Sequence, residues 1–147
     1  MKLLFKLIIL AAVFYLGFYF GANQALAPTT QLADQLIGLQ SVSLMVDYGN
    51  DVVSVYNDTK LEPNQTVFDL LRLVASQNNL EFSTKDFGGE LGVFIESIGG
   101  IENNSISDHW WQYWVNNQYA KIGASQYRLS AGDIVEWKFI KGQLNNN

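Results

Sequence analysis

The pattern of hydrophobic and polar positions divides the chain into an apolar N-terminal segment, a short connecting region and a body of alternating strands. Residues 3–22 are apolar apart from Lys6, and residues 7–22 carry no charge. A helix of about 20 residues spans roughly 30 Å, the thickness of the hydrocarbon core of a bilayer. The pattern therefore predicts a transmembrane helix within residues 1–22, with the membrane as partner through residues 3–22.

Two interpretations of this segment stay open. A cleaved signal peptide would use Lys2 and Lys6 as its basic start and residues 25–27, Ala-Leu-Ala, as its cleavage site. Pro28 directly after that site disfavours cleavage, and the aromatic residues 18–20 suit a membrane interface. We expect an uncleaved signal anchor, single-pass in the cell membrane with the C-terminal domain extracytoplasmic. A cleaved leader would instead make the protein secreted.

Residues 23–40 are expected to form a stalk between the anchor and the folded domain. Pro28 stops any helix that continues from the apolar segment. After it, Leu32, Leu36 and Leu39 have the spacing of a short amphipathic helix. The simpler interpretation is a spacer, and the alternative is a seam for self-association.

Residues 41–142 are predicted to form one α+β domain, followed by a polar tail at residues 143–147. A helix should begin after the N-cap Thr66, with Asp69 as its capping-box partner, and end near residues 77–79. A loop is expected at residues 57–65. Alternation and turn residues predict strands at residues 41–47, 52–56, 81–85, 93–98, 110–115, 118–120 and 134–140. This order favours a β-grasp-like fold, a mixed or antiparallel sheet with one helix packed on one face.

Composition and charge narrow the function. From residue 28 onward the chain has 7 basic and 14 acidic residues, a net charge of −7. An acidic domain without a basic stripe repels phosphate backbones, so we expect no nucleic-acid partner. The chain has no cysteine, which excludes disulfides, thiolate metal sites and cysteine nucleophiles.

A cluster of aromatic residues follows residue 109 and is the strongest candidate for a binding site. In a strand, Trp111, Tyr113 and Val115 share one face, which should be core. The opposite face would combine tryptophans with amides, a composition suited to stacking on a flat ligand or a sugar. The candidate ligand-binding residues are Trp110, Gln112, Trp114, Asn116 and Tyr119. The alternative is that both faces are covered and the aromatic residues are purely structural.

Signals for catalysis or a metal are weak. His109 is the one histidine of the chain, and a metal site needs several such ligands. The glycines around Glu90 lack the spacing and the following Lys-Ser/Thr of a phosphate loop, and no nucleophile-elbow motif is present. We therefore expect no enzyme activity, no metal site and no bound cofactor.

Four motifs, in order along residues 42–140, resemble those of the transcobalamin-like C-terminal domain family. Residues 66–71, Thr-Val-Phe-Asp-Leu-Leu, resemble its helix start, and residues 95–101, Ile-Glu-Ser-Ile-Gly-Gly-Ile, resemble its strand and turn. Residues 111–117, Trp-Gln-Tyr-Trp-Val-Asn-Asn, resemble its W-Q-Y-Y-V-N-G signature, and residues 132–137, Gly-Asp-Ile-Val-Glu-Trp, its last strand. The resemblance implies a β-grasp-like domain that binds a soluble ligand.

The resemblance also implies a candidate ligand. In that family a domain of this kind covers one side of cobalamin, while a large helical barrel holds the other side. This chain has no such barrel, so half of a corrinoid site would be missing, and Asn117 replaces the usual turn glycine. The expected function is a membrane-anchored ligand-binding module for a corrinoid or another planar molecule. The alternative is a structural or protein-interaction domain of a surface assembly, and the exposure of Trp110 and Trp114 should separate the two.

Overall fold

The computed structural model describes residues 38–89 and 92–142. Its contacts group the chain into two units, Met1–Gly38 and Leu39–Asn147, and the second unit carries the elements described below. The predicted transmembrane helix and nearly all of the predicted stalk lie outside the described residues. Within the described residues, no helix has the length and apolar character needed to cross a membrane.

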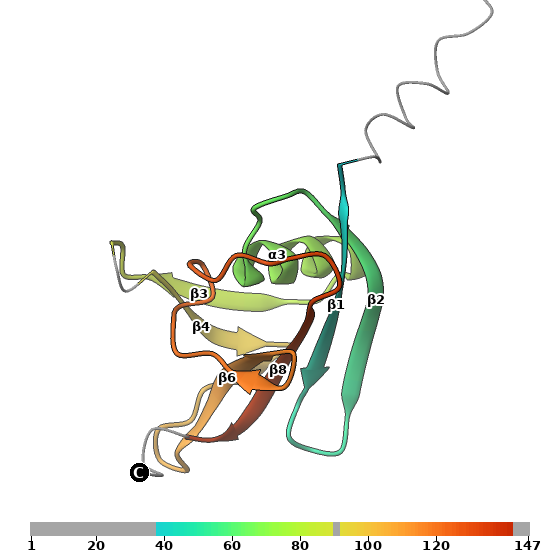
Figure 1. Ribbon diagram of the computed structural model, residues 1–147. Coiled ribbons are helices and arrows are strands. Elements are labelled where there is room, and N and C mark those ends of the chain that lie inside the picture. Colours follow the sequence, from blue (N-terminus) through green and yellow to red (C-terminus); the bar gives the residue numbers. More distant parts are fainter. Residues whose placement is uncertain (1–37, 90–91, 143–147) are drawn as a thin grey trace, which may run out of the picture. The chain divides into compact units, whose positions relative to one another are not determined.

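The larger layer of the domain is a five-stranded mixed sheet in the order β2-β1-β8-β6-β7 (Figure 1). The strands are β1 (Gln40–Asp47), β2 (Val53–Leu61), β6 (His109–Val115), β7 (Gln118–Tyr119) and β8 (Ile134–Lys141). The first and last strands, β1 and β8, lie side by side and parallel. All other neighbours in this sheet are antiparallel. The two ends of the domain sequence therefore meet in the centre of the sheet.

A second, three-stranded sheet contains β3 (Phe82–Asp86), β4 (Val93–Ile98) and β5 (Ile101–Glu102). The α+β class is confirmed, whereas the expectation of a single sheet is corrected. Gly99 and Gly100 both adopt positive φ angles, 60° and 78°, and turn the chain back so that β5 pairs with β4. A tight turn of this kind needs residues that tolerate the left-handed region, which is why glycine occupies both positions. β4 therefore pairs with β3 and β5 and not with a strand of the larger sheet.

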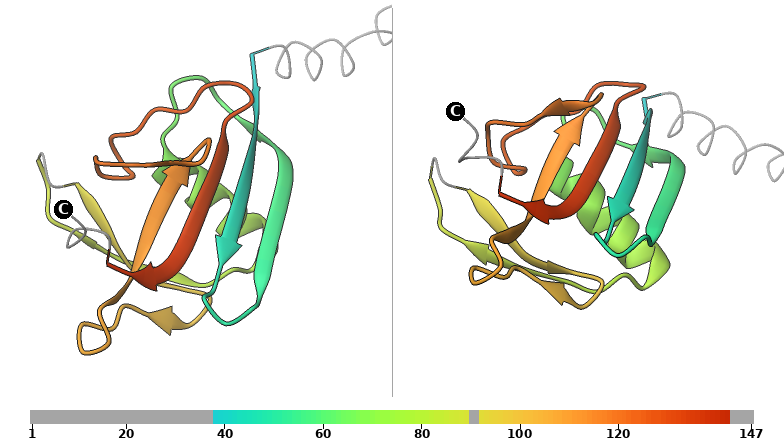
Figure 2. Two further views of the ribbon diagram at one scale, coloured as in Figure 1. Left: turned by 60° about the horizontal axis from the view of Figure 1, so that its bottom comes forward. Right: turned by 90° about the horizontal axis from the view of Figure 1, so that it is seen from below.

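The single described helix is α3 (Val67–Asn78), as the capping signals predict. The Thr66 side chain accepts a hydrogen bond from the Asp69 amide at 3.2 Å, and the Asp69 carboxylate accepts one from the Thr66 amide at 3.0 Å. The helix ends at Asn79, whose φ of 53° is left-handed. Its buried face is formed by Val67, Leu70, Leu71, Val74 and Ala75. Figure 2 shows the helix on one side of the four long strands.

Strand β2 is longer than predicted. Residues 57–61 were expected to lie in a loop, but they pair with the start of β1. The register shifts between Val42 and Leu44, and opposite this shift Asp58 adopts a φ of 52° and accepts a hydrogen bond from Ser41 Oγ at 3.1 Å. A β-bulge of this kind absorbs an extra residue without ending the strand. The turn-forming residues in this stretch therefore mark a bulge rather than a loop.

The core lies between the inner face of the larger sheet and the layer formed by α3 and the smaller sheet. From the larger sheet it receives Val42, Leu44, Val46, Trp111, Tyr113, Val115, Val135 and Trp137, all of them buried. Ile95 and Ile98 of β4 and the apolar face of α3 pack against them. The predicted core face of β6 is confirmed. The hairpin after β6 turns at Asn116 and Asn117, with φ angles of 52° and 64°.

Candidate ligand-binding site

The outer face of the five-stranded sheet carries the predicted aromatic residues of β6. The registers align Met45, Glu136, Trp114 and Tyr119 in one row across β1, β8, β6 and β7. The centroids of the Trp114 and Tyr119 rings lie 5.2 Å apart. Lys138 Nζ lies 5.0 Å from the centroid of the Trp114 ring. Lys138 also pairs with Glu136, which is only 7% exposed. Long neighbouring side chains thus shield a carboxylate on a sheet face that the one described helix, α3, does not cover.

Trp110 and Trp114 are both half-buried. Their exposure therefore favours neither the binding interpretation nor the structural one. The Trp110 indole N–H already donates to Asp108 Oδ1 at 2.9 Å. Gln112 Nε2 donates to the Lys141 carbonyl at 3.1 Å. Both polar groups therefore already have hydrogen-bond partners within the domain.

Asn116 has a structural role in the turn. Its Nδ2 donates to Asp133 Oδ1 at 2.8 Å, and its Oδ1 accepts a hydrogen bond from the Ile134 amide at 3.0 Å. The side chain therefore ties the β6–β7 turn to the turn that begins β8. Both ends of the Asn116 amide are therefore committed to holding the fold.

A pocket of about 160 Å³ lies between the facing edges of β4 and β6. Phe94 and Ile95 of β4, Trp111 and Tyr113 of β6 and the buried Trp137 of β8 line it. Residues 119–120 and 122–124, which follow the hairpin turn, complete the wall, and Gln112 and Tyr119 of the predicted site belong to the lining. Trp110, Trp114 and Asn116 lie outside this lining. The pocket thus combines two residues of the predicted site, Gln112 and Tyr119, with residues that were not predicted to belong to it.

Hydrogen bonds connect the two edges of the pocket. At one end, Asn103 Nδ2 donates to the Ile95 carbonyl and Asn103 Oδ1 accepts from the Trp111 amide, both at 2.7 Å. Across the pocket wall, the Tyr113 hydroxyl donates to the Ile122 carbonyl at 2.7 Å, and the Ala120 amide donates to the Tyr113 carbonyl at 3.1 Å. A side-chain bridge and an anchored loop therefore join the two edges where β4 and β6 form no strand ladder.

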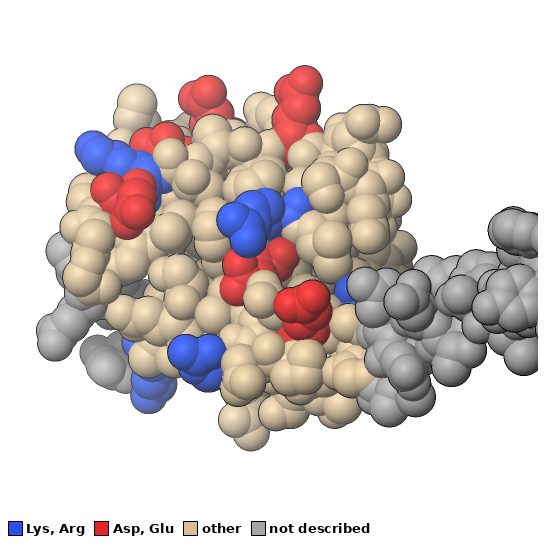
Figure 3. All heavy atoms as spheres, turned by 90° about the horizontal axis from the view of Figure 1, so that it is seen from above, with Lys and Arg blue, Asp and Glu red and all other residues tan. Residues whose placement is uncertain are grey.

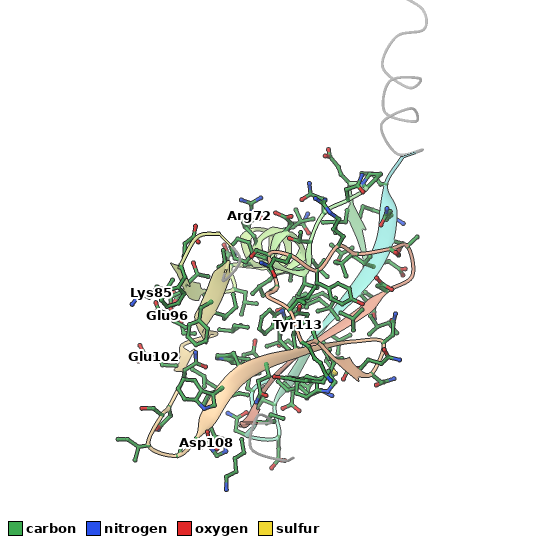
Figure 4. The ribbon with its side chains drawn as sticks, turned by 60° about the vertical axis from the view of Figure 1, so that its left-hand side comes forward. Arg72, Lys85, Glu96, Glu102, Asp108 and Tyr113 are labelled. Carbon is green, nitrogen blue, oxygen red and sulfur yellow. The ribbon has the colours of Figure 1, made fainter. Side chains whose placement is uncertain are left out.

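Exposed apolar side chains lie in and beside the lining of the pocket. Phe94 is 39% exposed and Ile122 is 51% exposed, although each also lines the pocket. Phe87 is 52% exposed and its ring lies 6.3 Å from that of Phe94, with Lys85 Nζ 5.1 Å from the Phe87 ring. Single exposed apolar residues are ordinary, but several that adjoin one concavity indicate a binding surface. Figure 4 labels Lys85 of β3 and Glu96 of the neighbouring strand β4.

The pocket wall contains a tyrosine with a shifted pKa. Tyr113 lies in the interior in Figure 4 and is only 6% exposed. Burial raises the pKa of Tyr113 well above its ordinary value of 10.0, and the neighbouring Tyr127 and Tyr119 raise it further. The hydroxyl therefore stays protonated and keeps donating to the loop at any physiological pH.

The raised pKa of Tyr113 predicts that the folded domain becomes less stable at alkaline pH. Above about pH 10 the tyrosine ionises in the unfolded chain while it stays protonated in the folded one, so the unfolded state is favoured as the pH rises. We expect the contribution of Tyr113 to the free energy of unfolding to be fully present below pH 10. It should then fall by up to about 1.4 kcal/mol per pH unit. Urea unfolding between pH 8.5 and 11.5 measures this slope.

The Tyr113→Phe variant is the control for that slope. It should unfold about 1 kcal/mol more easily at neutral pH, because the bond to the Ile122 carbonyl is lost. Its curve above pH 10 should be flatter than that of the wild type. Parallel curves would assign the alkaline slope to other groups.

Sequence reasoning missed the pocket because it arises between strands that are distant in the sequence. The two strands were predicted at residues 93–98 and 110–115, but nothing in their sequences says that their edges face each other. One local signal was available: Ile122 is an isolated branched apolar residue in a polar loop, next to Lys121 and Gly123.

The distribution of charged side chains does not indicate another binding site. On the face seen in Figure 3, acidic and basic side chains are interspersed and separated by wide uncharged areas. Within the described residues, no group of three or more His, Asp or Glu side chains is arranged to hold a metal ion. Two larger pockets, of about 410 and 590 Å³, lie beside α3. The pocket between β4 and β6 is the stronger candidate because two residues of the predicted site, Gln112 and Tyr119, line it.

Sequence and structure comparisons then give the relationship of this chain to known proteins. The family described as "Domain of unknown function (DUF4430)" matches residues 64–141. The chain belongs to this family. The matched region of the DUF4430 domain begins just before α3 and ends with β8, so it includes both strands that border the pocket. No curated protein sequence matches the chain.

Two solved structures resemble the DUF4430 domain at low sequence identity. The crystal structure of a candidate metal-binding protein from Ruminococcus gnavus ATCC 29149 is 18% identical, with a TM-score of 0.53, and the match covers 70% of this chain and 98% of that one. Haptocorrin in complex with Cbi is 17% identical with a TM-score of 0.64, and the match covers 70% of this chain but only 25% of haptocorrin. At such identities the likeness shows a shared fold. It confirms the predicted resemblance to the transcobalamin-like family.

Proposed function

We propose that this protein is a non-catalytic ligand-binding module whose pocket between β4 and β6 receives one edge of the ligand. The observation that carries this proposal is the combination of a preformed gap, an aromatic lining and an exposed apolar rim at Phe94 and Ile122. Most sites that enclose a whole small molecule have volumes of roughly 300–1,000 Å³. A pocket of about 160 Å³ suits part of a molecule, with the remainder lying outside.

The ligand that fits best is a planar molecule, with a corrinoid as the first candidate. The fold similarity to haptocorrin, whose structure contains Cbi, supports this assignment, as does the β-grasp-like arrangement of the sheet and α3. The match covers a quarter of haptocorrin, so a corrinoid bound in this pocket would keep its other side open to a second surface. Of the residues predicted from sequence, Gln112 and Tyr119 would contact the ligand directly.

Trp110 and Trp114 have a different place in this proposal. They lie on the outer face of the sheet, and Tyr119 lies against Trp114 while also lining the pocket. A ligand or partner that extends past Tyr119 would therefore meet the Trp114 ring next. In the cell, residues 3–22 would anchor the module in the membrane and hold it on the extracytoplasmic side.

Cobinamide binding to the full chain tests the proposal. The protein, held in detergent micelles because of its apolar N-terminal segment, would be titrated with cobinamide by calorimetry. We expect saturable binding, and we expect Ile122→Ser to weaken it at least tenfold. This factor corresponds to about 1.4 kcal/mol, the value of one or two buried methylene groups.

Ile106→Ser is the matched control. Ile106 is 98% exposed and lies in the loop before β6, outside the pocket lining, so its replacement should leave affinity unchanged. No heat of binding with the wild type would overturn the corrinoid assignment. Equal weakening by the two substitutions would overturn the assignment of the pocket.

A further inference from the structure

Among the described residues, the outer edge of β2 has no strand paired with it, and it lies at the end of the sheet away from the pocket. β2 is the last strand on one side of the larger sheet, with nine residues, and its described partner is β1 alone. Such an edge presents a row of unpaired N–H and C=O groups to solvent. The opposite end of the same sheet is β7, which has only two residues. Any extension of this sheet by hydrogen bonding is therefore favoured at β2.

The first half of β2 lacks the features that usually protect an edge strand. Such protection comes from charges, proline or a bulge. The charges of β2, Asp58 and Lys60, and its bulge all lie in the second half. The first half contains Val53, which is 48% exposed, and Val55, which is 57% exposed. An exposed, regular and uncharged edge of this kind favours pairing with another strand.

The hydrogen-bond register shows which groups face outward. The Tyr48 amide donates to the Val52 carbonyl at 3.0 Å, so the backbone of Val52 points toward β1. Because this direction alternates along a strand, the backbone of Ser54 also points toward β1. The backbones of Val53 and Val55 then point to the free edge. Both side chains lie on the outer face of the sheet, in register with Asp47 and Met45 respectively.

This register is self-complementary. If a second copy pairs antiparallel about a two-fold axis at Ser54, Val53 of each copy lies opposite Val55 of the other. Both residues have outward N–H and C=O groups, so they can form hydrogen-bonded pairs, and their side chains meet on the same face. The regular part of β2, residues 53–57, carries no charge. No two like charges then face each other directly.

We propose that two copies of this chain associate through the β2 edges, with Val53 and Val55 in register, to form one continuous sheet. The dimer is isologous, because the same stretch of chain serves both copies. The edge of β2 is on the opposite side of the sheet order from β6 and β7, so both pockets stay open in the dimer. This inference does not depend on the identity of the ligand.

Cysteine crosslinking of the full chain tests the register directly. The natural chain has no cysteine, so Ser54→Cys introduces a single thiol at the proposed axis. Facing residues in a non-hydrogen-bonded pair have Cα atoms about 4.5 Å apart, within the range that a disulfide spans. We expect mild oxidation to crosslink most of the Ser54→Cys protein into dimers. Lys60→Cys, on the same strand but off the axis, should stay largely uncrosslinked.

Sedimentation in detergent with the unmodified thiol-free chain gives a second measurement. Val55→Lys should weaken dimerisation at least tenfold, because it places a charge at the centre of the paired edge. Ile134→Lys is its matched control, since Ile134 is 51% exposed but lies on β8, an internal strand. A wild type that remains monomeric, or equal crosslinking of the two cysteine variants, would overturn the proposal.

Discussion

Replacing Trp111 with alanine should lower the free energy of unfolding by about 3–5 kcal/mol, the range for truncating a large buried aromatic side chain. Trp111 is 5% exposed, and its indole N–H donates to the Ile101 carbonyl at 2.8 Å. Its ring lies 6.0 Å from Tyr48 and 5.4 Å from Phe139. The substitution removes these ring contacts and leaves the Ile101 carbonyl without its donor. It also removes part of the pocket lining.

Urea unfolding followed by far-ultraviolet circular dichroism measures this loss without relying on tryptophan fluorescence. Trp110→Ala is the matched control, because the two tryptophans are adjacent on one strand and face opposite sides of the sheet. Trp110 is half-buried, so its truncation should cost less than half as much. Equal losses for the two variants would mean that the outer face is as well packed as the core.

Asn103→Ala should destabilise the domain by about 2–4 kcal/mol, although it removes only a small side chain. The Asn103 side chain connects the Ile95 carbonyl of one sheet to the Trp111 amide of the other. Leaving a buried donor or acceptor without a partner costs about 1–3 kcal/mol each. Two groups lose their partner here at once, and the two strand edges that border the pocket lose their bridge.

The matched control is Asn104→Ala, in the next position of the chain. Asn104 Oδ1 accepts hydrogen bonds from the Ile106 and Ser107 amides in an exposed turn, so water can replace it at a cost of about 1 kcal/mol or less. Hydrogen exchange at the Trp111 amide gives a local readout. Exchange there should accelerate in Asn103→Ala beyond what the global loss of stability explains, and unchanged exchange would exclude the bridging role.

Local parts of the fold could be predicted from the sequence. Thr66 and Asp69 predicted the start of α3, and their capping box is present in the structure. Alternation along β6 predicted that Trp111 and Tyr113 face the core, and both are buried. These predictions succeed because each depends on residues within one element, where the geometry of a helix or strand fixes the direction of successive side chains.

Other parts of the fold could not be predicted, even though the sequence analysis had singled out the residues concerned. Asn57 and Asp58 have the composition of a loop, but pairing with β1 makes them part of a bulged strand. Asn116 was a candidate ligand residue, yet its amide is committed to Asp133 and Ile134, about 17 positions away in the chain. In each case the role of the residue is set by a partner from a different part of the sequence.

The sequence by itself determined the α+β class, the helix and its caps, the strands around the aromatic hairpin and the core face of that hairpin. Only the tertiary structure decided that β1 and β8 pair in parallel, that β3, β4 and β5 form a separate sheet, and that Asn103 bridges β4 to β6. The physical reason is that helix capping and strand alternation depend only on residues that are close together in the sequence. The pocket and the free edge of β2 depend on which strands become neighbours, and that choice is made by the packing of the whole domain.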